Sequence, residues 1–170
     1  MSKQLKMLVW WSVFISIWAT IYAVIYTAIP MKEPAMWTTY MTVATLFLCN
    51  GDLKKIPSIG VCAIAGFAWG IFCLWVCAAT SGLGGYPSLA IGVFIAVLGC
   101  CLLHLVVGAK VAIFGCTPMA FITFAVCFAV NGENVVTICL TLMAGLVLGA
   151  LMVISGQWAT KLAKMDSDGQ

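Results

Sequence analysis

Long apolar segments alternate with short polar connections along this chain, and the longest segment without an Asp, Glu, Lys or Arg covers 56–109. It is interrupted at 81–87, where the sequence reads SGLGGYP. A membrane-spanning helix needs about 20 consecutive apolar residues, whereas a helix on the core of a soluble protein usually keeps a polar face. The segment therefore predicts two membrane-spanning helices on either side of a turn.

The same pattern over the whole chain predicts an all-α membrane protein with six transmembrane helices. The expected spans are about 7–29, 35–49, 58–80, 88–108, 111–130 and 135–158, followed by a cytoplasmic tail over 159–170. Lys3 and Lys6 precede the first span, as they would in a signal peptide. However, this span is longer than the apolar part of a signal peptide, and no clear small-x-small cleavage site follows it. We therefore expect a single transmembrane domain over 1–170 in which the first span is retained.

Composition and charge agree with a membrane protein and set its orientation. Hydrophobic residues make up 64% of the chain and charged residues 8%, against about 25% charged in soluble domains. With a cytoplasmic N-terminus only Lys32 falls outside, and cytoplasmic connections favour lysine. The lysines that then fall inside are Lys3, Lys6, Lys54, Lys55, Lys110, Lys161 and Lys164. Both termini are expected in the cytoplasm, and a chain without arginine is not expected to bind nucleic acid.

Two segments of the chain resemble each other at a fixed shift. Segment 37–52 aligns with 118–133 when it is moved by 81 positions, so that Thr42 matches Thr123, although the first and fourth spans match weakly. A duplicated unit of three helices enters the membrane from opposite sides. The pattern therefore predicts two inverted three-helix repeats, about 7–80 and 88–158, with chance similarity among apolar helices as the alternative.

Further repeated residues mark helix ends and helix contacts. An Asn-Gly pair followed by an acid occurs in both segments, and both repeats contain a G-x-x-x-G pattern. Glycine next to asparagine is typical of helix C-termini, and paired glycines allow helices to approach closely. The expected helix ends are Asn50, Gly51, Asn131 and Gly132, and the expected packing residues are Gly66, Gly70, Gly145 and Gly149.

The second and fifth spans are short, and proline interrupts the fifth. From Pro118 to Asn131 there is room for a helix of about 20 Å, less than the roughly 30 Å hydrocarbon core. Short or proline-interrupted spans at matching places in two repeats indicate a solute pathway, whereas a proline kink filled by neighbours is the alternative. If a half-helix begins at Pro118 within the membrane, Pro118→Ala is expected to restore a continuous helix and close the path.

The candidates for a solute pathway are Thr42, Thr117, Pro118, Thr123 and His104. An ionisable side chain inside a span is a functional candidate by default, and His104 is the one that lies deep in a predicted span. Its alternative is a neutral imidazole bonded to a backbone carbonyl or a threonine hydroxyl. For the threonines, lining a wet path competes with hydrogen bonding at helix contacts.

Other chemistry is not expected. The nine cysteines lie in apolar spans, form no C-x-x-C pair and have no histidine or carboxylate at ligand spacing. We expect packing thiols, with no metal and no cofactor. The sequence contains no nucleophile–base pair, phosphate loop or carboxylate dyad, so an enzyme is not expected.

Part of the sequence is similar to a known family. Residues 114–122 read FGCTPMAFI, and together with Asn131-Gly132, the Asn50-Gly51 copy and the six-span length they resemble the domain-of-unknown-function 1097 family, the YcdZ-like proteins. The resemblance implies a multi-pass protein of the bacterial inner membrane without an established activity, and it supplies no catalytic residues.

These features favour a channel or facilitator for a small, neutral solute of unknown identity in the lipid bilayer. The alternative is a membrane scaffold or accessory subunit that transports nothing. The glycine-rich faces also indicate a possible homo-oligomer.

The lysine distribution generates a topology prediction. Cysteines introduced in the 30–34 and 82–86 connections should react with an impermeant thiol reagent from outside the cell, and a cysteine near Lys54 only from inside. The opposite labelling pattern would overturn the six-span assignment.

Overall fold

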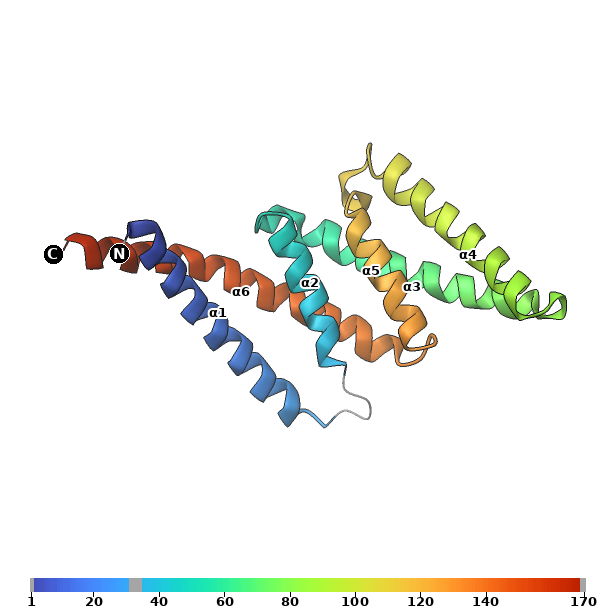
Figure 1. Cartoon of the computed structure of the whole chain (residues 1–170), viewed down its shortest axis with the longest axis horizontal. Coiled ribbons are helices and arrows are strands. Elements are labelled where there is room, and N and C mark those ends of the chain that lie inside the picture. Colours follow the sequence, from blue (N-terminus) through green and yellow to red (C-terminus); the bar gives the residue numbers. More distant parts are fainter. Residues whose placement is uncertain (1, 31–34, 169–170) are drawn as a thin grey trace.

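The structure is a computed structural model that describes residues 2–30 and 35–168, and within these ranges it contains helices and connections but no strand. The connection 31–34, with Lys32, lies outside the described residues. The α-helices are α1 (Lys3–Ala28), α2 (Met36–Leu48), α3 (Ile56–Ala79), α4 (Gly85–Cys101), α5 (Thr117–Ala129) and α6 (Val135–Asp168), as Figure 1 shows. Shorter helical turns are η1 (Leu53–Lys55), η2 (Ser81–Leu83), the π-helical η3 (Leu102–Val107) and η4 (Ala112–Phe114).

Four of the described helices are long and apolar enough to cross a membrane, which confirms the predicted all-helical class. They cover Lys3–Ala28, Leu53–Ala79, Gly85–Val107 and Val135–Met165. The other two, α2 and α5, have 13 residues each and reach about 20 Å. Six complete spans therefore stay a prediction.

The last helix continues ten residues further than the sequence pattern predicted. The expected span ended at 158, whereas α6 runs to Asp168. Ala159 and Ala163 are fully buried in this continuation, and α1 lies alongside α6. Packing against α1 thus stabilises the helix over most of the segment 159–170, which was predicted to be a tail.

The helices pair across the two halves of the sequence. In Figure 1, α1 and α2 both lie against α6, whereas α4 and α5 both lie against α3, and α2 meets α5 in the centre. Trp11 secures the α1–α6 pair because its indole N–H donates to the Met152 carbonyl oxygen at 2.8 Å. The start of α1 and the end of α6 lie together at one end of the molecule.

Two glycines of α3 allow its backbone to approach α5. A Cβ atom at Gly66 would clash with the carbonyl oxygen of Ala120 and the hydroxyl of Thr123. At Gly70 it would collide with the side chain of Cys127. The predicted packing residues of the first G-x-x-x-G pattern therefore lie in a helix contact.

Two glycines of α6 do the same against α2. A Cβ atom at Gly145 would clash with the Thr39 carbonyl oxygen and the Thr42 hydroxyl, and one at Gly149 would lie 3.1 Å from Leu46 Cδ2. The limiting contacts at Gly145 are with backbone and a buried hydroxyl, whereas at Gly149 the nearest atom ends a flexible side chain.

The two Asn-Gly pairs end α2 and α5, as the sequence predicted. Asn50 and Gly51 have φ values of 56° and 67°, and Asn131 and Gly132 have values of 50° and 72°. The N–H of Gly51 reaches back to the carbonyl of Leu46 at 3.0 Å, and that of Gly132 reaches Cys127 at 2.9 Å. Left-handed residues are common at helix C-termini because such bonds satisfy the last carbonyls.

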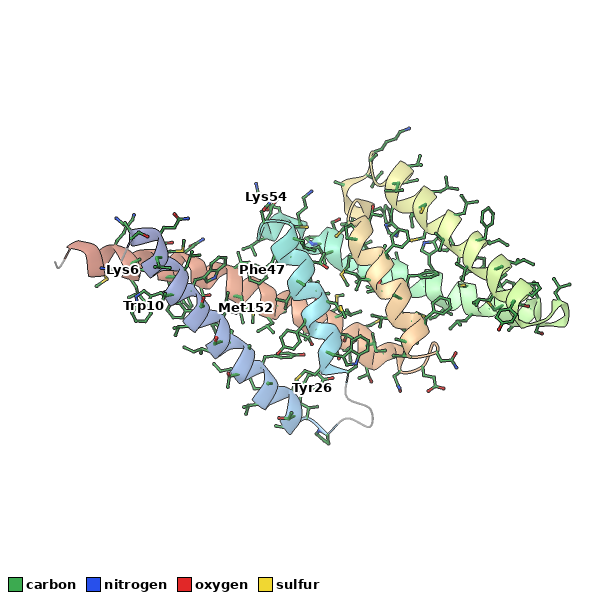
Figure 2. The ribbon with its side chains drawn as sticks, viewed as in Figure 1. Lys6, Trp10, Tyr26, Phe47, Lys54 and Met152 are labelled. Atoms are coloured by element: carbon green, nitrogen blue, oxygen red, sulfur yellow. The ribbon has the colours of Figure 1, made fainter. Side chains whose placement is uncertain are left out.

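Large apolar side chains cover the outside of the helices. Trp75, Phe94, Leu140 and Val147 are all exposed, each by more than 60%. A surface of this kind is stable against lipid tails, and Figure 2 shows such side chains pointing away from the ribbon along the outer helices.

The glycine contacts generate a stability prediction. Gly66→Ala and Gly145→Ala should each lower the free energy of unfolding by about 1–3 kcal/mol, because the backbones must separate to admit the methyl group. Thermal unfolding in detergent measures the loss as a lower Tm. Gly82→Ala is the matched control, since nothing lies within 4 Å of a Cβ atom at Gly82. Equal Tm values for all three variants would contradict the close approach.

Candidate functional site

Three of the five pathway candidates meet where α4 connects to α5. After α4 the chain continues as η3, which carries His104, and then turns back through η4 to the first residues of α5, Thr117 and Pro118. The hydroxyl of Thr117 donates to the backbone carbonyl oxygen of His104 at 3.3 Å. We call this place, formed by His104, Phe114 and Thr117, the His104 junction.

The fifth helix begins at the junction instead of passing through it. Pro118 lies in the first turn of α5, which starts at Thr117. Proline suits this position because the first N–H groups of a helix have no acceptor within the helix. Of the two alternatives for the fifth span, the structure shows the helix that starts at the proline and not the kink.

The His104 side chain is held by the connection between α4 and α5. Its imidazole is 2% exposed, and Nδ1 lies 2.9 Å from the carbonyl oxygen of Phe114. A carbonyl oxygen only accepts, so Nδ1 carries the hydrogen of this bond. The ring also meets the Phe114 ring edge-on with centroids 6.4 Å apart, and Cys62 Sγ lies 3.5 Å from Nδ1. These contacts are those of the imidazole–carbonyl alternative, but they involve only one of the two ring nitrogens.

A cavity of about 160 Å³ is lined in part by the residues that follow Phe114, Gly115 and Cys116. The hydroxyl-bearing residues Thr45 and Ser58 are part of its lining, and so is the exposed Lys55. The complete lining is Thr45, Leu48, Cys49, Lys55, Ser58, Gly115, Cys116 and Pro118, from α2, η1, α3 and the start of α5. We call it the α2–α3–α5 cavity.

The junction and the cavity share one piece of chain. His104 bonds to the carbonyl of Phe114, and the next residues, Gly115 and Cys116, form part of the cavity wall. His104 therefore holds a segment that continues directly into the cavity wall. Thr45 belongs to the row of threonines on the second span, for which a path lining and helix contacts were both open. Ser58 was missed, because a single hydroxyl does not indicate which neighbour it will face.

Thr42 and Thr123 lie away from this place, in the glycine contacts. Both are fully buried. The Thr42 hydroxyl bonds to the Leu142 carbonyl of α6 at 3.0 Å, and the Thr123 hydroxyl bonds to the Met119 carbonyl of its own helix at 3.0 Å. Neither residue borders the α2–α3–α5 cavity. The contacts at both positions are those of helix packing, not of a lining role.

The remaining polar chemistry is sparse. In the part of the chain that the structure describes, no three His, Cys, Asp or Glu side chains are close enough to hold a metal ion. The cysteines are free thiols, five of them buried. Buried thiols of this kind pack as small apolar groups.

The helices and their apolar exterior define an all-helical membrane protein. The chain belongs to the family described as protein of unknown function (DUF1097), whose model matches residues 11–160. Neither a curated protein nor a solved structure matches the chain.

The position of Pro118 changes the expected effect of replacing it. In a first turn the substitution restores no hydrogen bond, so Pro118→Ala should neither lengthen α5 nor stabilise the protein as a continuous helix would. We expect a loss of about 0.4–1 kcal/mol, since alanine leaves the unfolded chain more freedom. Thermal unfolding and circular dichroism measure both effects. Pro57→Ala, in the first turn of α3, is the matched control. A gain in helix content for Pro118→Ala alone would restore the original interpretation.

Proposed function

We propose that the protein is a channel or facilitator for a small, uncharged solute, built from two inverted three-helix repeats. The observation that carries this proposal is the reciprocal packing of the two halves. Gly66 contacts Thr123, and Gly145 contacts Thr42. The two glycines are 79 positions apart and the two threonines are 81 positions apart, so the second contact repeats the first. Because each contact in one half has its counterpart in the other, chance similarity is a poor explanation.

A second pair of contacts follows the same rule. Gly51, at the end of α2, lies against the Val153 side chain, and Gly132, at the end of α5, lies against Leu74. Leu74 and Val153 are again 79 positions apart. In Figure 1, α1, α2 and α3 run opposite to α4, α5 and α6 respectively, which is the relation expected for inverted repeats.

The sequences of α1 and α4 match weakly because large and small side chains have changed places between each of these helices and its partner. Trp11 of α1 lies against Gly156 of α6, and the corresponding pair is Gly92 of α4 against Cys77 of α3. A large residue on one helix of a pair is accompanied by a small one on its partner. Such an exchange keeps the helix contact while the two sequences differ.

Transport is supported by the two short helices. α2 and α5 meet in the centre of the molecule, and neither is long enough to cross the hydrocarbon core. In transporters with inverted repeats, substrates bind where interrupted helices begin or end. The α2–α3–α5 cavity lies at such a place, between the end of α2 and the start of α5.

The charge distribution supports an uncharged solute and a cytoplasmic location for both termini. Acidic and basic residues lie in terminal segments and connections, so nothing within the spans compensates a passing ion. Figure 2 places Lys6 and Lys54 on one side of the helices and Tyr26 on the other. The positive-inside tendency then puts the lysine side, with Lys55 in the cavity lining, in the cytoplasm of a bacterial inner membrane.

A scaffold or accessory subunit is the second candidate. The observation in its favour is that Thr42 and Thr123 are packed too tightly to line a path. A homo-oligomer stays a proposal as well. Two of the glycines that suggested it are used within the chain, because Gly92 lies against Cys77 and Gly99 against the ring of Trp69.

Liposome swelling tests the transport proposal. Protein in liposomes should admit urea, glycerol or acetamide faster than empty liposomes do. Ser58→Leu should reduce this rate to that of empty liposomes, because the larger side chain fills the α2–α3–α5 cavity. Ser16→Leu is the matched control, since Ser16 is exposed on α1 and bonds to its own helix. If no solute enters faster than into empty liposomes, the scaffold is favoured.

A further inference from the structure

His104 is the one histidine of the chain, and half of its hydrogen-bonding capacity is unused. Its Nε2 is buried and has no hydrogen-bond partner, the only such side-chain nitrogen or oxygen among the described residues. The residue as a whole is 2% exposed. Buried polar atoms in native proteins nearly always have a partner, so this exception requires an explanation.

The contacts of the ring determine what Nε2 offers. Nδ1 donates its hydrogen to Phe114, so in the neutral imidazole Nε2 is an acceptor with a free lone pair. Turning the ring over would replace Nδ1 by carbon and lose the bond to Phe114. Thr117 meanwhile holds the backbone of the same residue. The acceptor is therefore presented in a fixed orientation.

The backbone around His104 is unusual as well. Leu102–Val107 is π-helical, and the N–H of Gly108 donates to the carbonyl of Leu103, five residues earlier, at 2.9 Å. Such π-turns cost helix stability and occur frequently at functional sites. In α1, the counterpart of α4, the α-helix continues without this change to Ala28.

The other half of the molecule shows that holding the connection does not require an unused atom. There Tyr26 has the corresponding task, because its hydroxyl accepts from the N–H of Ala35 at 2.8 Å, just before α2 begins. The Tyr26 hydroxyl also lies 3.4 Å from the hydroxyl of Thr141. Thr141 lies 79 positions after Cys62, which is the neighbour of His104, and is therefore its counterpart. The tyrosine is thus satisfied on both sides, whereas the histidine is satisfied on one.

We propose that Nε2 of His104 is a binding point for a small uncharged molecule that carries an O–H or N–H donor. A lone-pair acceptor among apolar neighbours selects a donor and disfavours an anion. The inference rests on the proposed function, which supplies a small uncharged solute. It narrows the class of that solute to small neutral alcohols and amides. The site itself lies at the His104 junction, beside the segment that walls the α2–α3–α5 cavity.

Nitrogen-15 magnetic resonance tests the site directly, because a single histidine gives an unambiguous signal. Full-length protein labelled with [15N]histidine in lipid nanodiscs should show hydrogen on Nδ1 and none on Nε2. Adding acetamide should shift the Nε2 resonance in the direction of an accepted hydrogen bond. Acetone is the matched control, since it has nearly the same shape but no N–H donor, and it should leave the resonance unchanged.

Three results would overturn the proposal. The first is hydrogen on Nε2 instead of Nδ1. The second is an Nε2 resonance that no donor solute moves, including the case in which bound water alone accounts for its position. An equal response to acetone would mean a non-specific effect and would also overturn it.

A variant pair separates this site from the transport proposal. His104→Gln keeps an amide oxygen as acceptor and should retain uptake of acetamide into liposomes, whereas His104→Leu should lose it. Wild-type protein that shows the acetamide shift but no uptake would contradict transport and leave the site in place. Uptake that is equal for both variants, without an acetamide shift, would contradict the site and leave transport in place.

Discussion

The structure depends on the close approach of two helix pairs, α3 with α5 and α6 with α2. Inside a membrane the hydrophobic effect does not drive helices together, so association relies on close packing and hydrogen bonds between them. Gly66 and Gly145 permit this packing at equivalent points, where carbonyl and hydroxyl oxygens of the partner occupy the space of a side chain. These contacts hold the short helices in the centre, and thereby place the cavity and the junction.

Local features were predictable from the sequence, whereas the pairing of the helices was not. The apolar runs, the Asn-Gly helix ends and the start of α5 near Pro118 each follow from a few adjacent residues. The imidazole–carbonyl bond of His104 was expected as one alternative for the same reason. By contrast, no local signal shows that α3 packs on α5 and not on its neighbour in sequence, α2. That pairing determines which atoms Thr42 contacts, where Ser58 and the cavity lie, and how far α6 continues.

The two proposed repeats differ in the chemistry that they carry. At the junctions, tyrosine in one half and histidine in the other hold the chain that leads into a short helix. The cavity shows the same divergence: the position of Lys55 is occupied by Asn134 in the second half, and that of Thr45 by Val126. If the two halves are repeats, their chemistry is one-sided: Thr45, Ser58 and Lys55 of the first half line a cavity, and the histidine of the second half has no histidine as its counterpart.

The crossed pairing also constrains how the chain is made. Thr42 bonds to Leu142, 100 residues later, so this contact of α2 waits until α6 has been synthesised, whereas Thr39 already meets Tyr22 of α1. During that interval α2, a helix of 13 residues, lacks the helix against which it mainly packs. The first half cannot complete its packing alone, because α1 and α2 both pack on α6. Assembly of this protein is therefore expected to be a late, concerted event after the last helix emerges, and not a stepwise addition of finished hairpins.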